Sequence, residues 1–475
     1  MPRLVLMSVL LLLTLNVWAD DSLSAANLAR IRDAAMASDY AYKELSILTD
    51  QIGPRLAGSA PAEAAVRQTA MALEQLGLNV GFVAVTVPHW VRGQAQATLV
   101  DYPRRPSGVQ QRLVIAALGN SPATPENGIT ATVLVVHNFD ELQSQAARVK
   151  GRIVVFDVPF DQHLADNGYA DTAYQQVAQY RFNGPAQAAR LGAVAALVSS
   201  AGGDDHQPHT GMTVWPSGDR RIPAGALAAA DAALIDRLAR QGRVRLHLIM
   251  TSRTLPDVQS HNVVADLRGS SAPDQVVIVS GHLDSWDLGT GAQDDAVGVA
   301  AAMGVAAVFK QLGLHPQRTL RVVAWMNEEN GLSGAQAYAR DLAASIPNHV
   351  AAIESDNGSG RPFGIAADIL PQDAYSLSPV FAALRPLGIS VFSLLHRSPG
   401  ADIAPLVAGG VPGFAPLVDT RHYFDVHHNA NDTLDRVDPD NLRRQVAVMA
   451  VLSWWLANAD PFSRLPTRVF EPGGD

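Results

Sequence analysis

Short buried strands alternate with helices along the C-terminal half of the chain. The runs at Val276–Ser280 and Leu320–Trp325 are almost continuously apolar, and a third apolar run covers Val350–Ile353. Between the first two runs, apolar residues from Val297 to Leu312 recur at helical spacing. Strands without a polar face must be covered by helices on both sides. The pattern therefore predicts an α/β fold with a mixed, largely parallel sheet between two helical layers.

The N-terminal half has a different texture. Ser59–Leu76 predicts a helix with a serine cap and an early proline, and Leu78–Val87 predicts a strand. Short β-branched runs follow, such as Ala131–His137 and Arg152–Val158, together with alanine-rich helical stretches. We therefore expect one domain built from residues 20–104 and 253–475, and an inserted β-rich domain over residues 105–252.

The first residues have the composition of an export signal. Arg3 gives a positive start, Leu4–Trp18 is apolar, and Val17–Ala19 offers a cleavage site before two aspartates. The apolar run is shorter than the roughly 20 residues that span a membrane comfortably. We expect a cleaved signal peptide over residues 1–19, no stable membrane span in the mature chain, and a periplasmic or secreted location. An uncleaved N-terminal anchor is the alternative.

Composition excludes several classes of protein. Among 475 residues, 48% are hydrophobic and 17% are charged, which is typical of a folded chain. The net charge of −9 argues against a nucleic-acid binder, which needs a basic face. The chain has no cysteine, so disulfides, cysteine nucleophiles and thiolate metal sites are all excluded.

Carboxylates and histidines follow the predicted strands. Each has a simple structural explanation by itself, such as a helix cap. In α/β sheets, however, ligands bind beyond the carboxyl ends of strands, and carboxylates gathered there repel one another without cations. Imidazole nitrogen and carboxylate oxygen together suit zinc. The residues are His282, Asp284, Asp294, Asp295, Glu328, Glu329, Asp356, His427 and His428.

The motifs that contain these residues point to a family. GHLDSWDLGTGAQDD, WMNEENGLSGAQAYA, ESDNG and HHNANDT resemble motifs of the co-catalytic two-zinc exopeptidases of the aminopeptidase type. Within them the chain is most similar to the carboxypeptidase Q (plasma glutamate carboxypeptidase) group. Asp50–Ser59 resembles the beginning of that family's catalytic domain. The resemblance covers nearly the whole mature chain, and it implies that the inserted block is a protease-associated domain.

The resemblance also implies a role for each residue. It implies two zinc ions, with cobalt or manganese as alternatives, and Glu328 as the general base that deprotonates a bound water. Asp284 would orient His282, and Asp295 would support Asp294 through its backbone. His428 fits the family's spacing better than His427. The metal ligands would be His282 and Asp356 for one ion, Glu329 and His428 for the other, and Asp294 for both.

The substrate-binding residues stay unassigned at this stage. Tyr423 precedes the last motif and is a candidate oxyanion donor, although a packed aromatic ring is the simpler interpretation. Trp286 and Asp287 would either shape a substrate pocket or pack beside it. Arginines that hold a substrate carboxylate would come from the same half of the chain, the candidates being Arg361, Arg397 and Arg421.

These observations together predict an exported, zinc-dependent exopeptidase that hydrolyses short peptides or dipeptides. The alternatives are an aminopeptidase acting on longer peptides, a single-zinc enzyme similar to glutaminyl cyclases, and a peptide-binding protein without catalysis. The sequence leaves the choice between amino-terminal and carboxy-terminal cleavage open. The family implies a homodimer, and no nucleic-acid partner is expected.

Overall fold

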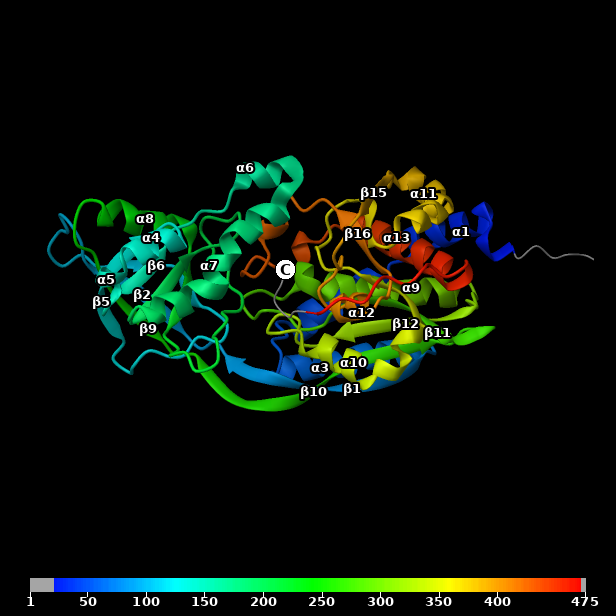
Figure 1. Ribbon diagram of the computed structural model, residues 1–475, viewed down its shortest axis with the longest axis horizontal. Coiled ribbons are helices and arrows are strands. Elements are labelled where there is room, and N and C mark those ends of the chain that lie inside the picture. The colour runs from blue at the N-terminus through cyan, green and yellow to red at the C-terminus, as the bar shows by residue number, and fades with distance from the viewer. Residues whose placement is uncertain (1–20, 471–475) are drawn as a thin grey trace, which may run out of the picture.

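The computed structural model describes residues 21–470, so the expected signal peptide lies outside the described residues. The described chain forms two bodies, each built on an eight-stranded sheet (Figure 1). The first sheet has the order β1-β10-β12-β11-β13-β16-β14-β15. Its strands are β1 (Asn79–Val91), β10 (Arg253–Leu267), β11 (Ala272–His282), β12 (Arg318–Trp325), β13 (His349–Glu354), β14 (Pro362–Asp368), β15 (Val391–Leu394) and β16 (Gly413–Val418).

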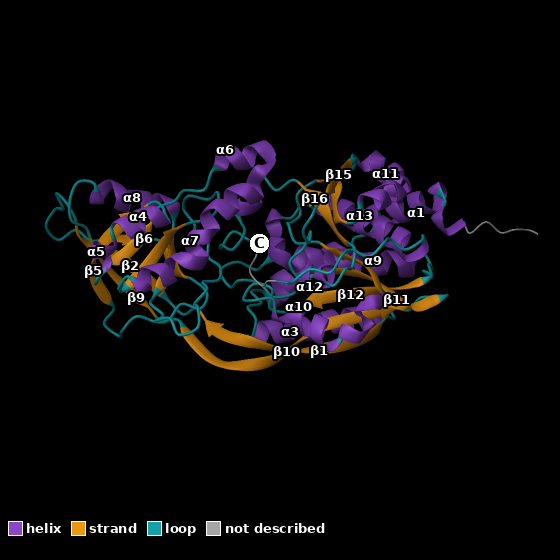
Figure 2. Cartoon of the chain, viewed as in Figure 1, coloured by secondary structure: helices purple, strands orange, loops and turns teal. Residues whose placement is uncertain are grey.

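Helices cover both faces of the first sheet, as the sequence predicts (Figure 2). Along β11, Val277 and Val279 join the core that contains α9 and α13, whereas Ile278 joins a second cluster with Tyr338 of α10. This alternation follows from the two-residue period of a strand. The helices are α1 (Ala25–Met36), α2 (Tyr40–Ser46), α3 (Ala60–Gln75), α9 (Val297–Gln311), α10 (Ser333–Asp341), α11 (Ser378–Leu384), α12 (Ala404–Ala408) and α13 (Pro439–Asn458).

The strands at the centre of this sheet are parallel. β11 pairs in parallel with β12 and β13, and β13 pairs in parallel with β16. The pairs β1–β10, β10–β12 and β14–β16 are antiparallel, which makes the sheet mixed. The carboxyl ends of β11, β12 and β13 therefore meet at one edge of the sheet.

Helix α9 is the central helix of this body. All of its residues from Val297 to Phe309 are buried, and Gly304 lets it approach α13, because a Cβ there would lie 3.0 Å from Val446. Within residues 21–470, Ala292–Gln311 is the one helical segment long and apolar enough to cross a membrane. The most apolar 18-residue stretch of this segment is entirely buried in the protein, and this core position accounts for its composition.

The second body is inserted between β1 and β10, which pair with each other along most of their length. Its sheet begins with β2, which pairs with β9 and precedes the expected boundary at residues 104 and 105. The second body therefore begins before the expected boundary, which was wrong. The pairing of β2 with β9 joins residues that are far apart in the sequence, so no local sequence pattern indicates it. The strands are β2 (Ala95–Asp101), β3 (Gln111–Leu113), β4 (Ile115–Ala117), β5 (Ile129–Val136), β6 (Ile153–Phe156), β7 (Ala195–Ser199), β8 (Ala224–Leu227) and β9 (Arg245–Met250).

Five helices accompany the second sheet. The longest, α7, extends toward the first body in Figure 1. The alanine-rich helical stretches expected in this part of the chain lie in α7 and α8. The helices are α4 (Phe139–Ser144), α5 (Ala146–Val149), α6 (Gln162–Leu164), α7 (Ala170–Arg190) and α8 (Ala229–Ala239).

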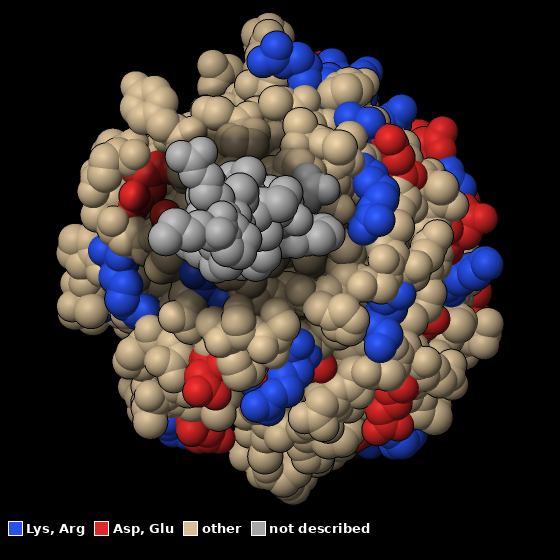
Figure 3. All heavy atoms as spheres, turned by 90° about the vertical axis from the view of Figure 1, so that its right-hand side faces the viewer, with Lys and Arg blue, Asp and Glu red and all other residues tan. Residues whose placement is uncertain are grey.

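Charged side chains of both signs are interspersed on the face of the molecule shown in Figure 3. The described residues visible on this face form no continuous basic area. Part of the acidic excess instead lies inside the molecule, because Asp284, Asp294 and Asp295 are all buried. Buried carboxylates are costly unless they are paired or bind a cation, so their position calls for an explanation.

His349, at the start of β13, should make folding sensitive to acid. Its buried ring contacts the Tyr338 hydroxyl at 2.8 Å, and burial lowers its pKa to about 4. The unfolded chain, with a histidine pKa of about 6.5, binds more protons between these values, so stability falls as the pH falls from about 6.5 to about 4. We expect a loss of about 2 kcal/mol between pH 7 and pH 5 from this group.

Urea unfolding at pH 7 and pH 5 checks this expectation. His349→Gln should be less stable at pH 7 but should lose less stability than the wild type on going to pH 5. The matched change at exposed His206, His206→Gln, should leave the pH dependence as it is. An identical pH dependence in the wild type and His349→Gln would contradict the assignment.

Candidate metal centre

The predicted site residues meet at the carboxyl edge of the parallel strands. His282 is the last residue of β11, Glu328 and Glu329 follow β12, and Asp356 follows β13. Asp294 lies in the helical turn Ala292–Ala296 that precedes α9. His428 lies in the loop after β16. The structure thus brings together all the residues that the sequence places at strand ends.

Asp294 is the central residue of this cluster. Its Oδ1 lies 3.0 Å from His282 Nε2, and its Oδ2 lies 3.0 Å from His428 Nε2. His282 Nε2 is also 3.4 Å from Asp356 Oδ1, and His428 Nε2 is 2.9 Å from Glu329 Oε2. The cluster therefore divides into two halves that share one carboxylate, each half with one imidazole and one further carboxylate.

The donor set of this cluster fits divalent metal ions. Asp294 Oδ2 is buried and has no hydrogen-bond partner, although His428 lies beside it, so the oxygen is free to coordinate. Burial and the Asp294 carboxylate raise the pKa of Glu329 to about 7. A cation would relieve the repulsion that this shift reflects. Nitrogen and oxygen donors without sulfur suit zinc, and a carboxylate with both oxygens available can bridge two ions.

Asp284 supports the site differently from the expectation. Its carboxylate Oδ1 lies 3.9 Å from His282 Nδ1, beyond hydrogen-bond distance, whereas its backbone carbonyl lies at 3.0 Å. The carbonyl therefore orients the His282 ring, and the expectation for the carboxylate was wrong. The carboxylate instead accepts the N–H groups of Asn327 at 2.7 Å and of Glu328 at 3.1 Å. It positions the loop that carries the two glutamates.

Asp295 joins the end of β11 to the start of α9. Its Oδ2 accepts the N–H of His282 and its Oδ1 accepts that of Gly298, both at 3.0 Å. A Cβ at Gly281 or Gly298 would lie within 2.6 Å of the Asp295 carboxylate, so only glycine fits at either position. Asp295 therefore acts through its side chain as well as through its place beside Asp294.

Two further residues of the first body hold the ligands, and sequence reasoning had not given either a role. The Asp432 carboxylate accepts the N–H of Gln293 at 2.6 Å and of Asp294 at 3.2 Å. Fully buried Arg55 donates to the carbonyls of Leu283, Thr290 and Gly291. It therefore shapes the loop between His282 and Asp294. Arg55 lies in the Asp50–Ser59 motif and Asp432 lies in the HHNANDT motif, so each belongs to a motif that the sequence analysis had singled out.

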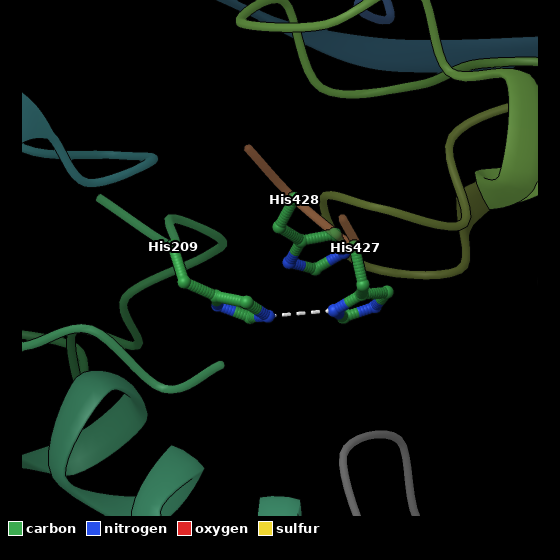
Figure 4. Close-up of side chains that lie close together, drawn as sticks. All are labelled: His209, His427 and His428. Atoms are coloured by element: carbon green, nitrogen blue, oxygen red, sulfur yellow. Dashed lines mark hydrogen bonds between the residues drawn. The ribbon is translucent and has the colours of Figure 1, made fainter. Parts of the chain in front are cut away.

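The second body also reaches the site. His209 and Thr210 lie in the loop between β7 and β8, and His209 Nε2 is 2.7 Å from His427 Nδ1 (Figure 4). The Thr210 carbonyl lies 3.3 Å from His428 Nδ1. Burial, with smaller effects of His427 and His428, lowers the pKa of His209 well below its usual value, so the ring is neutral. No pattern in the sequence indicated these contacts.

The other sequence candidates lie beside the site or at the surface. The Trp286 side chain is buried and packs on Gly119, while its backbone N–H donates to Glu329 Oε1 at 3.1 Å. Asp287 pairs with Arg92 at 2.6 Å. Trp286 therefore packs in the core and also lines a recess beside Asp294 and Glu329, whereas Asp287 holds Arg92. Tyr423 is a buried aromatic in contact with Phe424 and His427. The candidate arginines Arg361, Arg397 and Arg421 are exposed.

Sequence comparison agrees with this geometry. A family model described as peptidase family M28 matches residues 262–453. The chain is 38% identical over 423 residues to carboxypeptidase Q of Mus musculus, covering 88% of this chain and 86% of that protein. The chain belongs to peptidase family M28. Carboxypeptidase Q of Homo sapiens gives a similar match, with 38% identity over 427 residues, 89% of this M28 peptidase and 86% of the human protein.

Solved structures match the whole architecture of this M28 peptidase. A peptidase M28 precursor from Shewanella amazonensis is 35% identical and superposes with a TM-score of 0.86, covering 94% of this chain and 100% of that chain. A zinc aminopeptidase from Bacillus subtilis shares the fold at 18% identity, with a TM-score of 0.65 and coverage of 90% and 98%. This M28 peptidase is thus a metallo-exopeptidase with the mixed α/β fold expected from its sequence.

Proposed function

We propose that this M28 peptidase is an exported exopeptidase that hydrolyses short peptides or dipeptides with two zinc ions and Glu328 as the general base. The placement of Asp294 carries the proposal, since its two oxygens lie 3.0 Å from His282 on one side and from His428 on the other. A cluster divided in this way offers three protein donors to each of two ions.

The residues divide the chemistry among them. The zinc pair, when bound, activates a water molecule and polarises the scissile carbonyl. His282 and Asp356 would hold one ion, Glu329 and His428 would hold the other, and Asp294 would contribute to both. Burial, together with Asp356 and Glu329, raises the pKa of Glu328 well above its usual value. Glu328 is not among the ligands, so its carboxylate is available to accept a proton from the attacking water and pass it to the leaving amine.

The surroundings of the site favour small substrates. A narrow recess of about 10 Å³, enough for about one water molecule, lies against Asp294, Glu329 and His428, with Trp286 in its wall. Pockets for drug-sized ligands measure about 300–1,000 Å³. The second body contacts the ligand loop through His209 and Thr210 and limits access from that side. Export is inferred from the apolar segment at Leu4–Trp18.

A dipeptide panel with free and blocked ends tests the function. We expect the zinc-loaded protein to hydrolyse unblocked dipeptides, and products identified by mass spectrometry should reveal the terminus required. If, among the blocked substrates, only the N-blocked ones are cleaved, the enzyme is a carboxypeptidase, which the name of the 38% identical relatives favours. If, among the blocked substrates, only the C-blocked ones are cleaved, the enzyme is an aminopeptidase. Inactivity on the whole panel, with two zinc ions bound, would contradict the proposal.

A further inference from the structure

Two histidines from different bodies form a chain that ends at the metal centre. His209 Nε2 lies 2.7 Å from His427 Nδ1, and His427 Nε2 lies 3.3 Å from Asp294 Oδ2. His209 has no exposed surface, and His427 is 7% exposed. In Figure 4 a ring nitrogen of His209 points toward a ring nitrogen of His427. The His428 ring stacks on the His427 ring, with 3.6 Å between the ring centroids. His427 is not among the five expected metal ligands, so this chain has no role in the mechanism described above.

The contacts of the two rings determine where their protons lie. A neutral imidazole has one N–H and one lone pair. His209 Nδ1 is buried without a hydrogen-bond partner, so a proton there would be an unsatisfied buried donor. The proton therefore belongs on His209 Nε2, which donates to His427 Nδ1. His427 must then carry its own proton on Nε2.

The opposite arrangement has two costs. A His427 that donated from Nδ1 would leave the N–H of His209 unpaired at Nδ1. It would also place the Nε2 lone pair of His427, and not an N–H, 3.3 Å from the negatively charged Asp294 Oδ2. In the favoured arrangement the Nε2–H of His427 is uncommitted, because Asp294 Oδ2 accepts no hydrogen bond. The site thus contains a free donor beside the shared carboxylate.

We propose that His427 donates its Nε2–H to the reacting carbonyl oxygen of the substrate, and that His209 is the positioning residue that keeps the proton on that nitrogen. The inference rests on the proposed peptidase function and adds to it a donor controlled by the second body. Fixed donors aimed at developing negative charge are among the largest contributions to catalysis of acyl transfer.

The second body also fixes where this donor lies. The N–H and the Oγ1 of Thr210 both donate to the His428 carbonyl at 3.0 Å. The N–H of His209 donates to Ser200 Oγ at 2.9 Å. The loop after β7 therefore holds both histidines of the ligand loop, one through its ring and one through its backbone. Docking of the second body is a condition for placing the donor.

The tautomer can be measured without turnover. In histidine-labelled, zinc-loaded protein, ¹⁵N NMR should show His427 protonated at Nε2 and not at Nδ1, with the signals assigned by their loss in His427→Phe. His209→Leu should abolish that preference. A His427 protonated at Nδ1 in the wild type would overturn the proposal. If the wild type shows the expected tautomer but is inactive on every peptide, the peptidase function is overturned, whereas the assignment of the His427 tautomer still holds.

Kinetics test the positioning role. We expect His209→Leu to lower kcat by about tenfold or more, toward the ~10²–10³-fold loss for removing an oxyanion donor, with KM and zinc content unchanged. His209→Gln should recover part of kcat, because its amide N–H can donate to His427 Nδ1. The control His206→Leu changes an exposed histidine of the same loop and should have no effect. Wild-type kcat in His209→Leu, or loss of zinc from it, would overturn the positioning role.

A double-mutant cycle tests whether His209 acts through His427. The variant His427→Phe should lose kcat, and adding His209→Leu to it should cause no further loss. Losses that multiply would mean that His209 acts by another route and would overturn the proposal.

Discussion

Replacing Glu328 by glutamine should lower kcat by at least about 10²-fold while both zinc ions stay bound. Glutamine has nearly the same shape but cannot take a proton from the attacking water. The neighbouring residue Glu329 contacts His428 at 2.9 Å and keeps its place, since Asp284 holds the backbone of this loop. Steady-state kinetics on the best dipeptide of the panel, together with zinc analysis of the purified protein, give both quantities.

A matched variant separates loss of the base from a general effect of the substitution. Glu74→Gln changes an exposed glutamate of α3 and should leave kcat and zinc content as in the wild type. Glu328→Gln with near wild-type kcat would contradict the assignment of the general base. Loss of zinc from Glu328→Gln would show that this side chain belongs to the ligand set.

Replacing Asp294 by alanine should lower zinc affinity by more than the roughly 10–100-fold seen when groups behind a ligand are removed, and turnover should fall below detection. Asp294 provides the oxygens that face both His282 and His428, so its loss affects both halves of the cluster. Without Asp294, the two halves of the cluster no longer share a carboxylate. Zinc content after dialysis and activity at increasing zinc concentration measure the effect.

The control for this variant lies close to the same loops. Asp435→Ala removes an exposed carboxylate, with a side chain 75% exposed, a few residues after the ligand loop. It should keep wild-type zinc content and turnover. Two zinc ions retained per chain in Asp294→Ala would contradict the shared role of Asp294. Restoration of its activity by excess zinc would show that the residue contributes affinity but no essential geometry.

The sequence by itself determined the first body and the composition of its site. Apolar runs such as Val276–Ser280 and the helical spacing from Val297 onward encode their elements locally, because strand and helix periods are properties of consecutive residues. Parallel strands bring their carboxyl ends to one edge, so residues that follow them were expected to meet. The cluster around Asp294 is this expectation realised.

Only the tertiary structure decided the contacts between segments that are distant in the chain. Because β2 pairs with β9, the second body begins earlier than expected. The His282 ring is oriented by the backbone carbonyl of Asp284 and not by its carboxylate, which depends on the geometry of one turn. His209 and His427 are 218 residues apart, and each has an unremarkable local sequence. Their contact exists because the second body docks on the ligand loop. Periodicity reports the environment of a residue within its own element, whereas such contacts depend on how whole elements pack.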